Sequence, residues 1–166
     1  MYQILKTQLS ENEVNIFQSE IKNTPNITGY TKNEWVKFKD VWVAKVDGEV
    51  AGVCVNIEID REWTEIAVLY VLDRYRGKGI GLGLFNTSFE CLKENGKKIY
   101  TTTRNPKVEN YMIGKKFSFV SFFALPLPIL LFNLRFVCSI FRVREYFRKQ
   151  MYKNDLAPFK YGVLEL

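Results

Sequence analysis

Residues 68–84 of this 166-residue chain read VLYVLDRYRGKGIGLGL, and this stretch decides the fold class. Val68–Leu72 has the composition of a buried strand, and an apolar helical pattern begins after a basic turn. The glycines of this turn and of the helix start leave backbone N–H groups open to a ligand. They are Gly77, Gly79, Gly81 and Gly83. Because a helix directs the positive end of its dipole at its first turn, the stretch predicts an anion site, with phosphate as the expected ligand.

The spacing of these glycines excludes two common phosphate-binding motifs. No glycine is followed by the pattern of a P-loop, and the Gly-x-Gly-x-x-Gly fingerprint of dinucleotide-binding proteins fails at its third glycine. The pattern that remains is Arg-x-x-Gly-x-Gly, from Arg76 to Gly81. It resembles the acetyl-CoA pyrophosphate loop of the GNAT superfamily of N-acetyltransferases.

The resemblance extends to both sides of the loop. Leu69-Tyr-Val71 matches the Leu-x-Val strand that precedes the loop in this family, with Asp73 where a proline is often found. Downstream, the family often carries Asn-x-x-Ala-x-x-x-Tyr-x-x-x-Gly-Phe. The corresponding residues here are Asn105, Val108, Met112, Lys116 and Phe117. Met112 thus replaces the usual tyrosine, and Lys116 replaces the usual glycine.

The predicted fold class is α/β, a mixed α+β sheet of the GNAT-like type. Antiparallel strands are expected at 2–7, 41–46, 49–59 and 63–72, with a hairpin turn at Asp47-Gly48. Helices are expected from Ser10, whose buried face would carry Val14, Phe17 and Ile21, and over 79–95. A strand at 98–103 would then run parallel to the one before the loop, which completes a β-α-β unit for CoA binding.

One domain is expected over residues 1–166, since no linker or repeat divides a chain that is 47% hydrophobic. Residues 2–123 would form the GNAT-like core, and the match is specific over 65–117. Residues 124–166 would add an atypical helix and a final strand.

The resemblance implies an N-acetyltransferase that passes an acetyl group from acetyl-CoA directly to a primary amine, with no metal. In such folds the strand before the loop splays from its neighbour, and a backbone N–H near Leu69–Val71 binds the thioester oxygen. The implied CoA-binding residues are Leu69, Tyr70, Val71, Arg76, Gly77, Lys78, Gly79, Ile80, Gly81, Leu82 and Asn105. Arg76 and Lys78 can equally be surface cations, and Asn105 can equally be a helix N-cap before Pro106.

Two residues are candidates for proton transfer. Glu65 stands where some relatives carry a glutamate that deprotonates the amine, although a solvent-facing strand carboxylate is the alternative. Tyr111 precedes the expected tyrosine position by one residue, which corresponds to a rotation of about 100° on a helix. It either donates a proton to the leaving thiolate or is a surface aromatic.

The C-terminal part departs from the family pattern. A strand is expected at 117–123, followed by a break at Leu125–Pro128 and a long amphipathic helix at 129–152. Three interpretations of this helix remain open: a membrane span, a basic helix lying on an anionic membrane, or a helix that packs on the sheet, covers the acceptor pocket or forms a homodimer. Phe122, Phe123 and Phe132 suggest an apolar acceptor site, and 160–166 could return as an edge strand.

Composition limits the location and the partners of the protein. The formal net charge is +6 and the isoelectric point is near 9.2, yet no nucleic-acid motif is present, so nucleic acid is an unlikely partner. The acceptor would be a small-molecule or protein amine. The chain has no histidine, and its cysteines, Cys54, Cys91 and Cys138, are expected to be buried thiols in a reducing cytoplasm. The alternative function is a non-catalytic acyl-CoA-binding or membrane-associated regulatory module.

Overall fold

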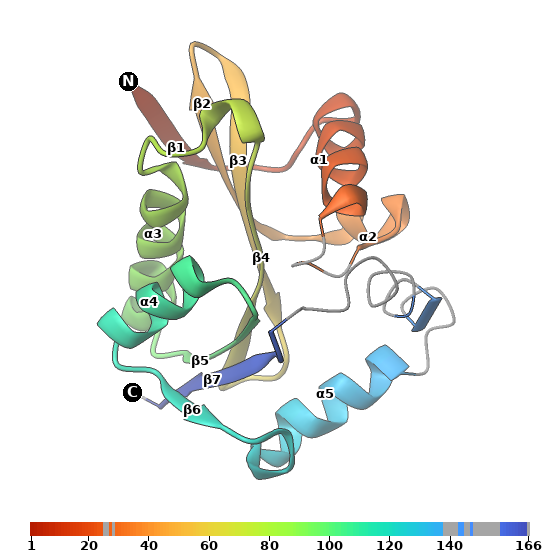
Figure 1. Cartoon of the computed structure of the whole chain (residues 1–166), viewed down its shortest axis with the longest axis vertical. Coiled ribbons are helices and arrows are strands. Elements are labelled where there is room, and N and C mark those ends of the chain that lie inside the picture. Colours follow the sequence, from red (N-terminus) through yellow and green to blue (C-terminus); the bar gives the residue numbers. More distant parts are fainter. Residues whose placement is uncertain (25–26, 28, 138–142, 145–146, 148–156, 166) are drawn as a thin grey trace.

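The framework of the protein is a seven-stranded sheet with the strand order β1-β2-β3-β4-β5-β7-β6 (Figure 1). The computed structural model describes residues 1–24, 27, 29–137, 143–144, 147 and 157–165. Among the described strands only β4 and β5 pair in parallel, so the expected mostly antiparallel sheet is confirmed. The strands are β1 (Tyr2–Lys6), β2 (Asp40–Val46), β3 (Glu49–Glu58), β4 (Trp63–Val71), β5 (Lys98–Thr103), β6 (Ser118–Val120) and β7 (Lys160–Leu164).

The first four strands form an antiparallel meander. The β2–β3 hairpin turns at Asp47 and Gly48, whose φ angles are 51° and 84°. Two consecutive positive φ angles are the signature of a type I′ turn, which an Asp-Gly pair favours because its backbone twist matches that of the strands. The hairpin predicted from these two residues is therefore confirmed.

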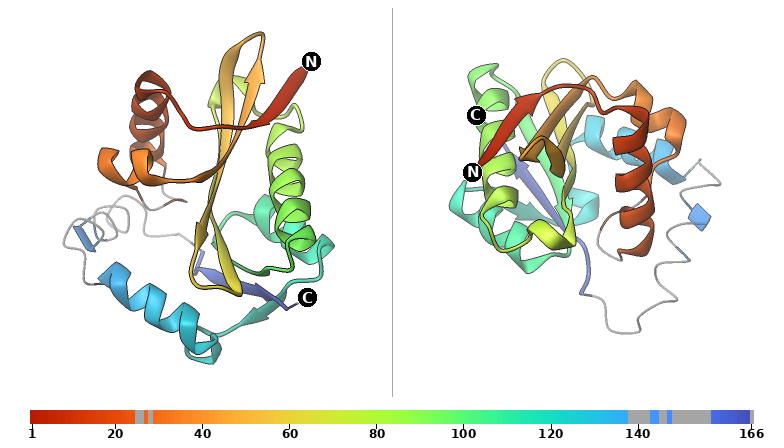
Figure 2. Two further views of the ribbon diagram at one scale, coloured as in Figure 1. Left: turned by 180° about the vertical axis from the view of Figure 1, so that it is seen from behind. Right: turned by 90° about the horizontal axis from the view of Figure 1, so that it is seen from above.

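Helices cover both faces of the sheet, as Figure 2 shows from behind and from above. The helices α1 (Glu11–Asn23), α2 (Lys32–Lys37) and α5 (Leu127–Val137) lie on one face, and α3 (Ile80–Glu94) and α4 (Pro106–Gly114) lie on the other. Each face has its own core. Val14, Phe17 and Ile21 of α1 are buried against the sheet on the first face, as predicted.

The N-terminal helices begin at capping boxes, in which an N-cap hydroxyl and a glutamate three residues later bond each other's backbone N–H. Ser10 and Glu13 form the box that was expected for α1. Thr31 and Glu34 form a second box, which begins α2 and lets Trp35 fill the core. No helix is expected here from the sequence alone, although the Thr-x-x-Glu pattern carries the same signal.

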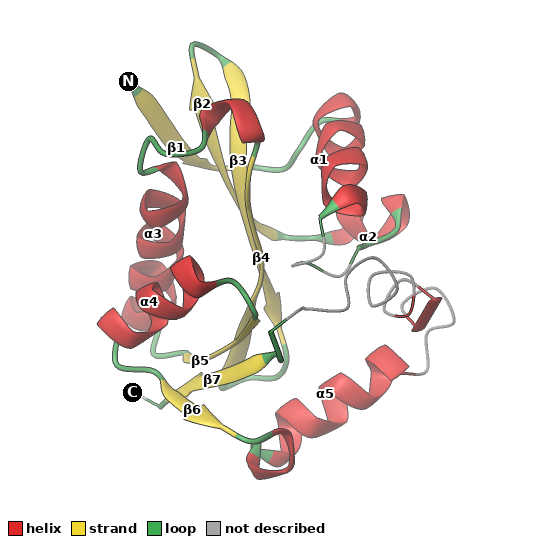
Figure 3. Cartoon of the chain, viewed as in Figure 1, coloured by secondary structure: helices red, strands yellow, loops and turns green. Residues whose placement is uncertain are grey.

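The C-terminal part differs from the prediction in three ways (Figure 3). The strand expected at 117–123 is only Ser118–Val120, because Ser121 begins a 3₁₀ turn over Phe122–Ala124. The helix α5 begins at Leu127, two residues early, and is described to Val137. The rest of the predicted helix at 129–152 lies mostly outside the described residues. The final strand β7 lies between β5 and β6, so it is an inner strand and not an edge strand.

Some of the expectations concern single residues or the membrane. No helix within the described residues is both long and apolar enough to cross a membrane.

The Cys54 thiol is fully buried and the Cys91 thiol is partly exposed, and neither forms a disulfide. Burial raises the pKa of the Cys54 thiol to about 12. Cys138 lies outside the described residues.

Candidate active site

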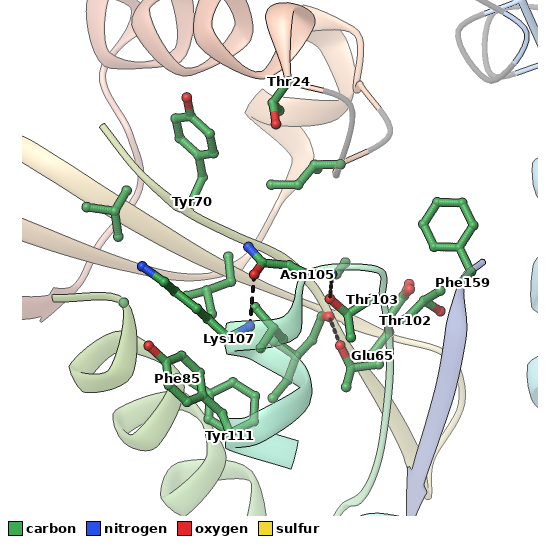
Figure 4. Close-up of a pocket in the computed structure, with 18 of the residues that line it drawn as sticks. Thr24, Glu65, Tyr70, Phe85, Thr102, Thr103, Asn105, Lys107, Tyr111 and Phe159 are labelled. Carbon is green, nitrogen blue, oxygen red and sulfur yellow. Dashed lines mark hydrogen bonds between the residues drawn. The ribbon is translucent and has the colours of Figure 1, made fainter. Parts of the chain in front are cut away.

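The site is created where β4 and β5 separate. The two strands pair only from Trp63 to Glu65 on β4, with Lys98–Tyr100 on β5. One side-chain bond continues the contact, from the Thr101 hydroxyl to the carbonyl of Ile66 at 2.9 Å. Beyond it β4 runs on to Val71 without a strand partner on this side among the described residues. A cleft of about 1090 Å³ opens at the separation (Figure 4).

The open edge of β4 supplies backbone donors to this cleft. The N–H of Leu72 bonds the carbonyl of Ala51 on β3, so strand alternation directs the N–H groups of Leu69 and Val71 to the opposite side. The guanidinium of Arg76 bonds the carbonyl of Val71 from that side at 3.2 Å, which confirms the direction. A bulge at Ala67 precedes these residues, since Val68 and Ile66 face consecutive residues of β3. The predicted splay and its exposed N–H groups are thus present.

The glycine loop forms the wall of the cleft next to this edge. Gly77 and Gly79 have φ angles of 79° and 76°, a conformation that glycine adopts without strain. Gly79 is the N-cap of α3, so the N–H groups of Ile80, Gly81 and Leu82 have no partner within the helix. An N-terminal first turn of this kind, without an acidic residue, favours a bound anion.

The four glycines do not share one role. A Cβ on Gly81 would meet only Val71 Cγ2, at the ordinary contact distance of 3.5 Å. A Cβ on Gly83 would lie 2.6 Å from the Tyr2 hydroxyl, because β1 packs closely on α3 there. Gly83 therefore serves helix–sheet packing, and the anion site consists of the glycines that precede it.

The cleft brings together most of the predicted site residues. Both predicted catalytic residues line it, as do all the predicted CoA-binding residues except Lys78 and Leu82. Arg76 is held by an ion pair of 2.7 Å with Asp73, and it lies 5.5 Å from the ring centre of Tyr70. Lys78 instead lies over the ring of Tyr75 at 5.4 Å, so its side chain acts at the surface of the loop.

Glu65 lies at the point where the two strands part. Only 8% of its surface is exposed, so it is not the solvent-facing carboxylate that the sequence left as an alternative. Its neighbour across the β4–β5 pair is Tyr100, which is buried. Burial and the nearby charge of Glu65 both raise the pKa of Tyr100, so this hydroxyl stays neutral. The Tyr100 oxygen accepts hydrogen bonds from Thr102 at 2.7 Å and from Asn133 of α5 at 3.2 Å.

The one-residue offset between Met112 and Tyr111 has a structural explanation. Met112 is fully buried and points to β7, where its Cε would lie 2.1 Å from a Cβ on Gly162. The preceding residue, Tyr111, lines the cleft, and its ring lies 5.7 Å from that of Phe85 on α3. The family's tyrosine position is thus used here for core packing, and a tyrosine one residue earlier reaches the cleft.

Asn105 connects β5 to α4 at the cleft. Its side-chain oxygen accepts a hydrogen bond from the N–H of Lys107 at 3.0 Å, and Pro106 follows at the first helical position. The predicted N-cap is therefore confirmed. Because Asn105 also lines the cleft, capping does not remove it from contact with a ligand.

Sequence reasoning missed much of the opposite wall. This wall comes from the end of α1 and the segment after it, from β5 and α5, and from Phe159 and β7, which are distant in sequence. The residues that it missed include Glu20, Tyr30, Thr102, Asn133, Phe159 and Tyr161. Their pattern carries no local motif, and only Phe122 on this side was anticipated.

The sequence that forms these splayed strands and this glycine-rich helix start matches a known protein family. The model of the acetyltransferase (GNAT) family matches residues 7–112, which is more than half of the chain. The chain belongs to the acetyltransferase (GNAT) family. Family membership makes it an acyltransferase, as the sequence predicted. No curated protein matches the chain.

Solved structures show the same fold at low sequence identity. Rv2747 from Mycobacterium tuberculosis, in complex with CoA, is 14% identical with a TM-score of 0.70, and the match covers 98% of this GNAT chain and 99% of the other. N-acetylglutamate synthase from Neisseria gonorrhoeae, with CoA and N-acetyl-glutamate, is 12% identical with a TM-score of 0.69. The match covers 98% of this chain but only 34% of the synthase. Ribosomal-protein-alanine N-acetyltransferase from Brucella melitensis is 21% identical with a TM-score of 0.58, over 72% of this chain and 86% of that one.

Proposed function

We propose that this protein is an N-acetyltransferase that transfers the acetyl group of acetyl-CoA to a primary amine by direct attack. The observation that carries the proposal is the meeting of two features in one cleft. The open edge of β4 presents the N–H groups of Leu69 and Val71, and the glycine-rich start of α3 lies beside it. The first feature fits a thioester carbonyl, and the second fits a pyrophosphate.

The expected position of CoA follows from this arrangement. Its pyrophosphate would bind the N–H groups of residues 77–82, with Arg76 next to it. Its pantetheine arm would lie between the separated parts of β4 and β5, and Asn105 would contact it from the start of α4. The acetyl group would then reach the bend of β4 near Glu65.

The transfer would take place in two proton-coupled steps. Glu65 would accept a proton from the amine, directly or through water, and the amine nitrogen would attack the thioester carbon. The negative oxygen of the tetrahedral intermediate would be bound by the N–H groups of β4, an arrangement worth a few kcal/mol. The C–S bond would then break, and Tyr111 would give its proton to the leaving thiolate. No covalent enzyme intermediate is formed.

The rival proposal of a non-catalytic CoA-binding module loses its main support. It depended on Met112 and Lys116, which replace the family's tyrosine and glycine, and on the lack of an identified acid. Tyr111 lines the cleft and is the proposed acid. Homodimer formation through α5, contact with a membrane and a cytoplasmic location stay predictions. α5 does present an apolar outer side for such contacts, with Leu127, Leu131 and Leu134 exposed.

A pair of glycine substitutions tests the CoA site. Gly81→Glu would place a carboxylate in the anion site without a steric clash, since a Cβ there meets only Val71 at 3.5 Å. At an effective dielectric constant near 20, a charge about 4 Å from the pyrophosphate costs about 4 kcal/mol, or roughly a thousandfold in affinity. Calorimetric titration with acetyl-CoA and desulfo-CoA should detect this loss.

The matched control is Gly114→Glu, at an exposed glycine of α4 outside the cleft with no atom within 4 Å of a Cβ. This variant should bind CoA like the wild type. Failure of the folded wild-type protein to bind desulfo-CoA would refute the proposal, and so would tight binding by folded Gly81→Glu. If the wild type binds CoA and Gly81→Glu does not, release of the CoA thiol in the presence of an amine acceptor would establish turnover.

A further inference from the structure

We infer that the acceptor is a primary monoamine on an aromatic or otherwise apolar body that carries no carboxylate. This inference rests on the proposed function, because it describes the half of the cleft that faces away from the glycine loop. The acceptor chamber is defined here as the part of the cleft that is lined by the end of α1 and the segment after it, by β4 and β5, by the 3₁₀ turn at Phe122 and α5, and by Phe159 and β7.

Aromatic side chains dominate the acceptor chamber. They come from five separate parts of the chain, and they are Tyr30, Tyr70, Tyr100, Phe122, Phe159 and Tyr161. Phe122 and Tyr161 pack edge to face at 5.6 Å, so the wall near β7 is continuous. Flat apolar walls bury the body of a ligand of matching shape, and aromatic faces attract a cationic ammonium group.

The charges of the described lining residues also favour an amine that carries no carboxylate. Glu65 and Glu20 supply negative charge on the acceptor side. The lysine and arginine among the described lining residues are Arg76, beside the glycine loop, and Lys107, at the start of α4. Arg76 also contacts the ring and the hydroxyl of Tyr70, but its charge is paired with Asp73 at 2.7 Å. Lys107 follows Asn105 on the side of the cleft where the proposed function places CoA.

One further arginine lies near the chamber. The guanidinium of Arg104 stacks on the ring of Phe159 at 3.7 Å, and Arg104 is not among the residues that line the cleft. Phe159 therefore lies between this cation and the chamber. A carboxylate on the acceptor would meet the charge of Glu65, and the described elements that line the acceptor chamber contribute no lysine or arginine to the cleft.

Glu65 is the carboxylate of the chamber that lies where β4 and β5 separate, next to the expected acetyl group, so it is the proposed partner of the amine. Tyr100 stays neutral and is fixed by hydrogen bonds from Thr102 and Asn133. Glu20 already accepts a hydrogen bond from the Tyr70 hydroxyl at 3.3 Å. Tyr70 lies five residues along β4 from Glu65, which is about 16 Å at the rise of a strand. From this separation of the two backbone positions we expect that a short diamine does not bridge the two carboxylates, which favours a monoamine.

A matched pair of ligands tests the inference. Phenethylamine and phenylalanine differ only by the α-carboxylate, and putrescine is a diamine without an apolar body. Each is titrated into the wild-type protein by calorimetry, both with and without saturating desulfo-CoA. Phenethylamine should bind at least about tenfold more tightly than phenylalanine and putrescine.

The Glu65→Gln variant tests the role of this carboxylate by the ratio of the two ligand affinities, which a general loss of structure would not change selectively. Removal of this charge should weaken phenethylamine much more than phenylalanine, because in phenylalanine the lost attraction to the ammonium is offset by the lost repulsion of the carboxylate. The preference for phenethylamine should therefore shrink or disappear. Glu62→Gln is the control, because Glu62 is an exposed partner of Lys98 outside the cleft and should change neither affinity. Desulfo-CoA affinity should be the same in all three proteins.

The outcomes separate this inference from the proposed function. If phenylalanine or putrescine binds as tightly as phenethylamine, or more tightly, the inference is overturned. The proposed function is unaffected by that result as long as the wild type binds desulfo-CoA. Absence of binding by phenethylamine at millimolar concentration in the CoA-loaded protein also overturns it. If the folded wild type does not bind desulfo-CoA, the proposed function is refuted instead. In that case the titrations of phenethylamine and phenylalanine without CoA still test the acceptor chamber.

Discussion

Gly162→Ala is expected to lower the free energy of unfolding, because Gly162 leaves room for Met112. A Cβ at this position of β7 would lie 2.1 Å from Met112 Cε and 3.3 Å from Phe117 Cδ1. The backbone of Gly162 does not have a positive φ, so alanine is acceptable in conformation and only the contact decides. Met112 is fully buried in the core beneath α3, so a displaced methyl group has to repack among buried neighbours.

The size of the effect can be set by comparison with known core substitutions. Overpacking of a core costs about 1–3 kcal/mol, and the loss of glycine from the unfolded chain returns about 0.4–1 kcal/mol. We therefore expect a net loss of about 1–2 kcal/mol. For a chain of this length, that lowers Tm by about 2–8 °C. Met112→Ala alone should cost about 2–5 kcal/mol by leaving a cavity.

The double variant tests whether the two residues act on each other. In Gly162→Ala/Met112→Ala the new Cβ partly fills the space that the methionine leaves, so the two costs should not add. We expect the double variant to be more stable than their sum by at least about 0.5 kcal/mol. Urea unfolding followed by circular dichroism measures all three values. The reasoning is wrong if Gly162→Ala is as stable as the wild type, or if the costs are additive.

Two further predictions concern proton transfer and pH. Tyr111→Phe should lower kcat in a thiol-release assay by about 100-fold or more, as expected for a general acid, with desulfo-CoA affinity unchanged; a kcat within threefold of the wild type would exclude Tyr111 as the acid. The Cys54 thiol has a pKa of about 12 in the folded protein and about 9 in the unfolded chain. Between these values only the unfolded chain loses the proton, so stability falls as pH rises above about 9, by up to about 1.4 kcal/mol per pH unit. Thermal unfolding from pH 8 to 10.5 should show a shallower fall for Cys54→Ala, and identical slopes would contradict this assignment.

The features that the sequence predicted correctly are those set by neighbours in the chain. The hairpin at Asp47-Gly48 depends on the φ angles of two residues, and the caps at Ser10 and Asn105 depend on side chains that bond the next turn. The glycine loop belongs to the same class, since its open N–H groups follow from Gly79 and the helix that begins there. Local rules of this kind act before the chain folds, and they were sufficient to indicate the family.

The predictions that failed involve competition between distant segments. The β7 strand was expected at an edge, yet it lies between β5 and β6 because it can pair with both. The strand predicted at 117–123 was longer than the observed β6, because apolar residues suit a strand and a turn equally well. In this chain Phe122 packs on Tyr161 and Phe123 is 90% exposed.

The sequence by itself determined that a glycine-rich loop with open N–H groups follows a buried strand, because conformation at glycine and dipole direction in a helix are local properties. Only the tertiary structure decided what lies opposite this loop. It placed Glu65 at the separation of two strands, turned Tyr111 toward the cleft by burying Met112 against Gly162, and brought Tyr100 and Asn133 together from 33 residues apart. The acceptor chamber consists of contacts between segments that meet only when the core closes, and no spacing along the chain records them.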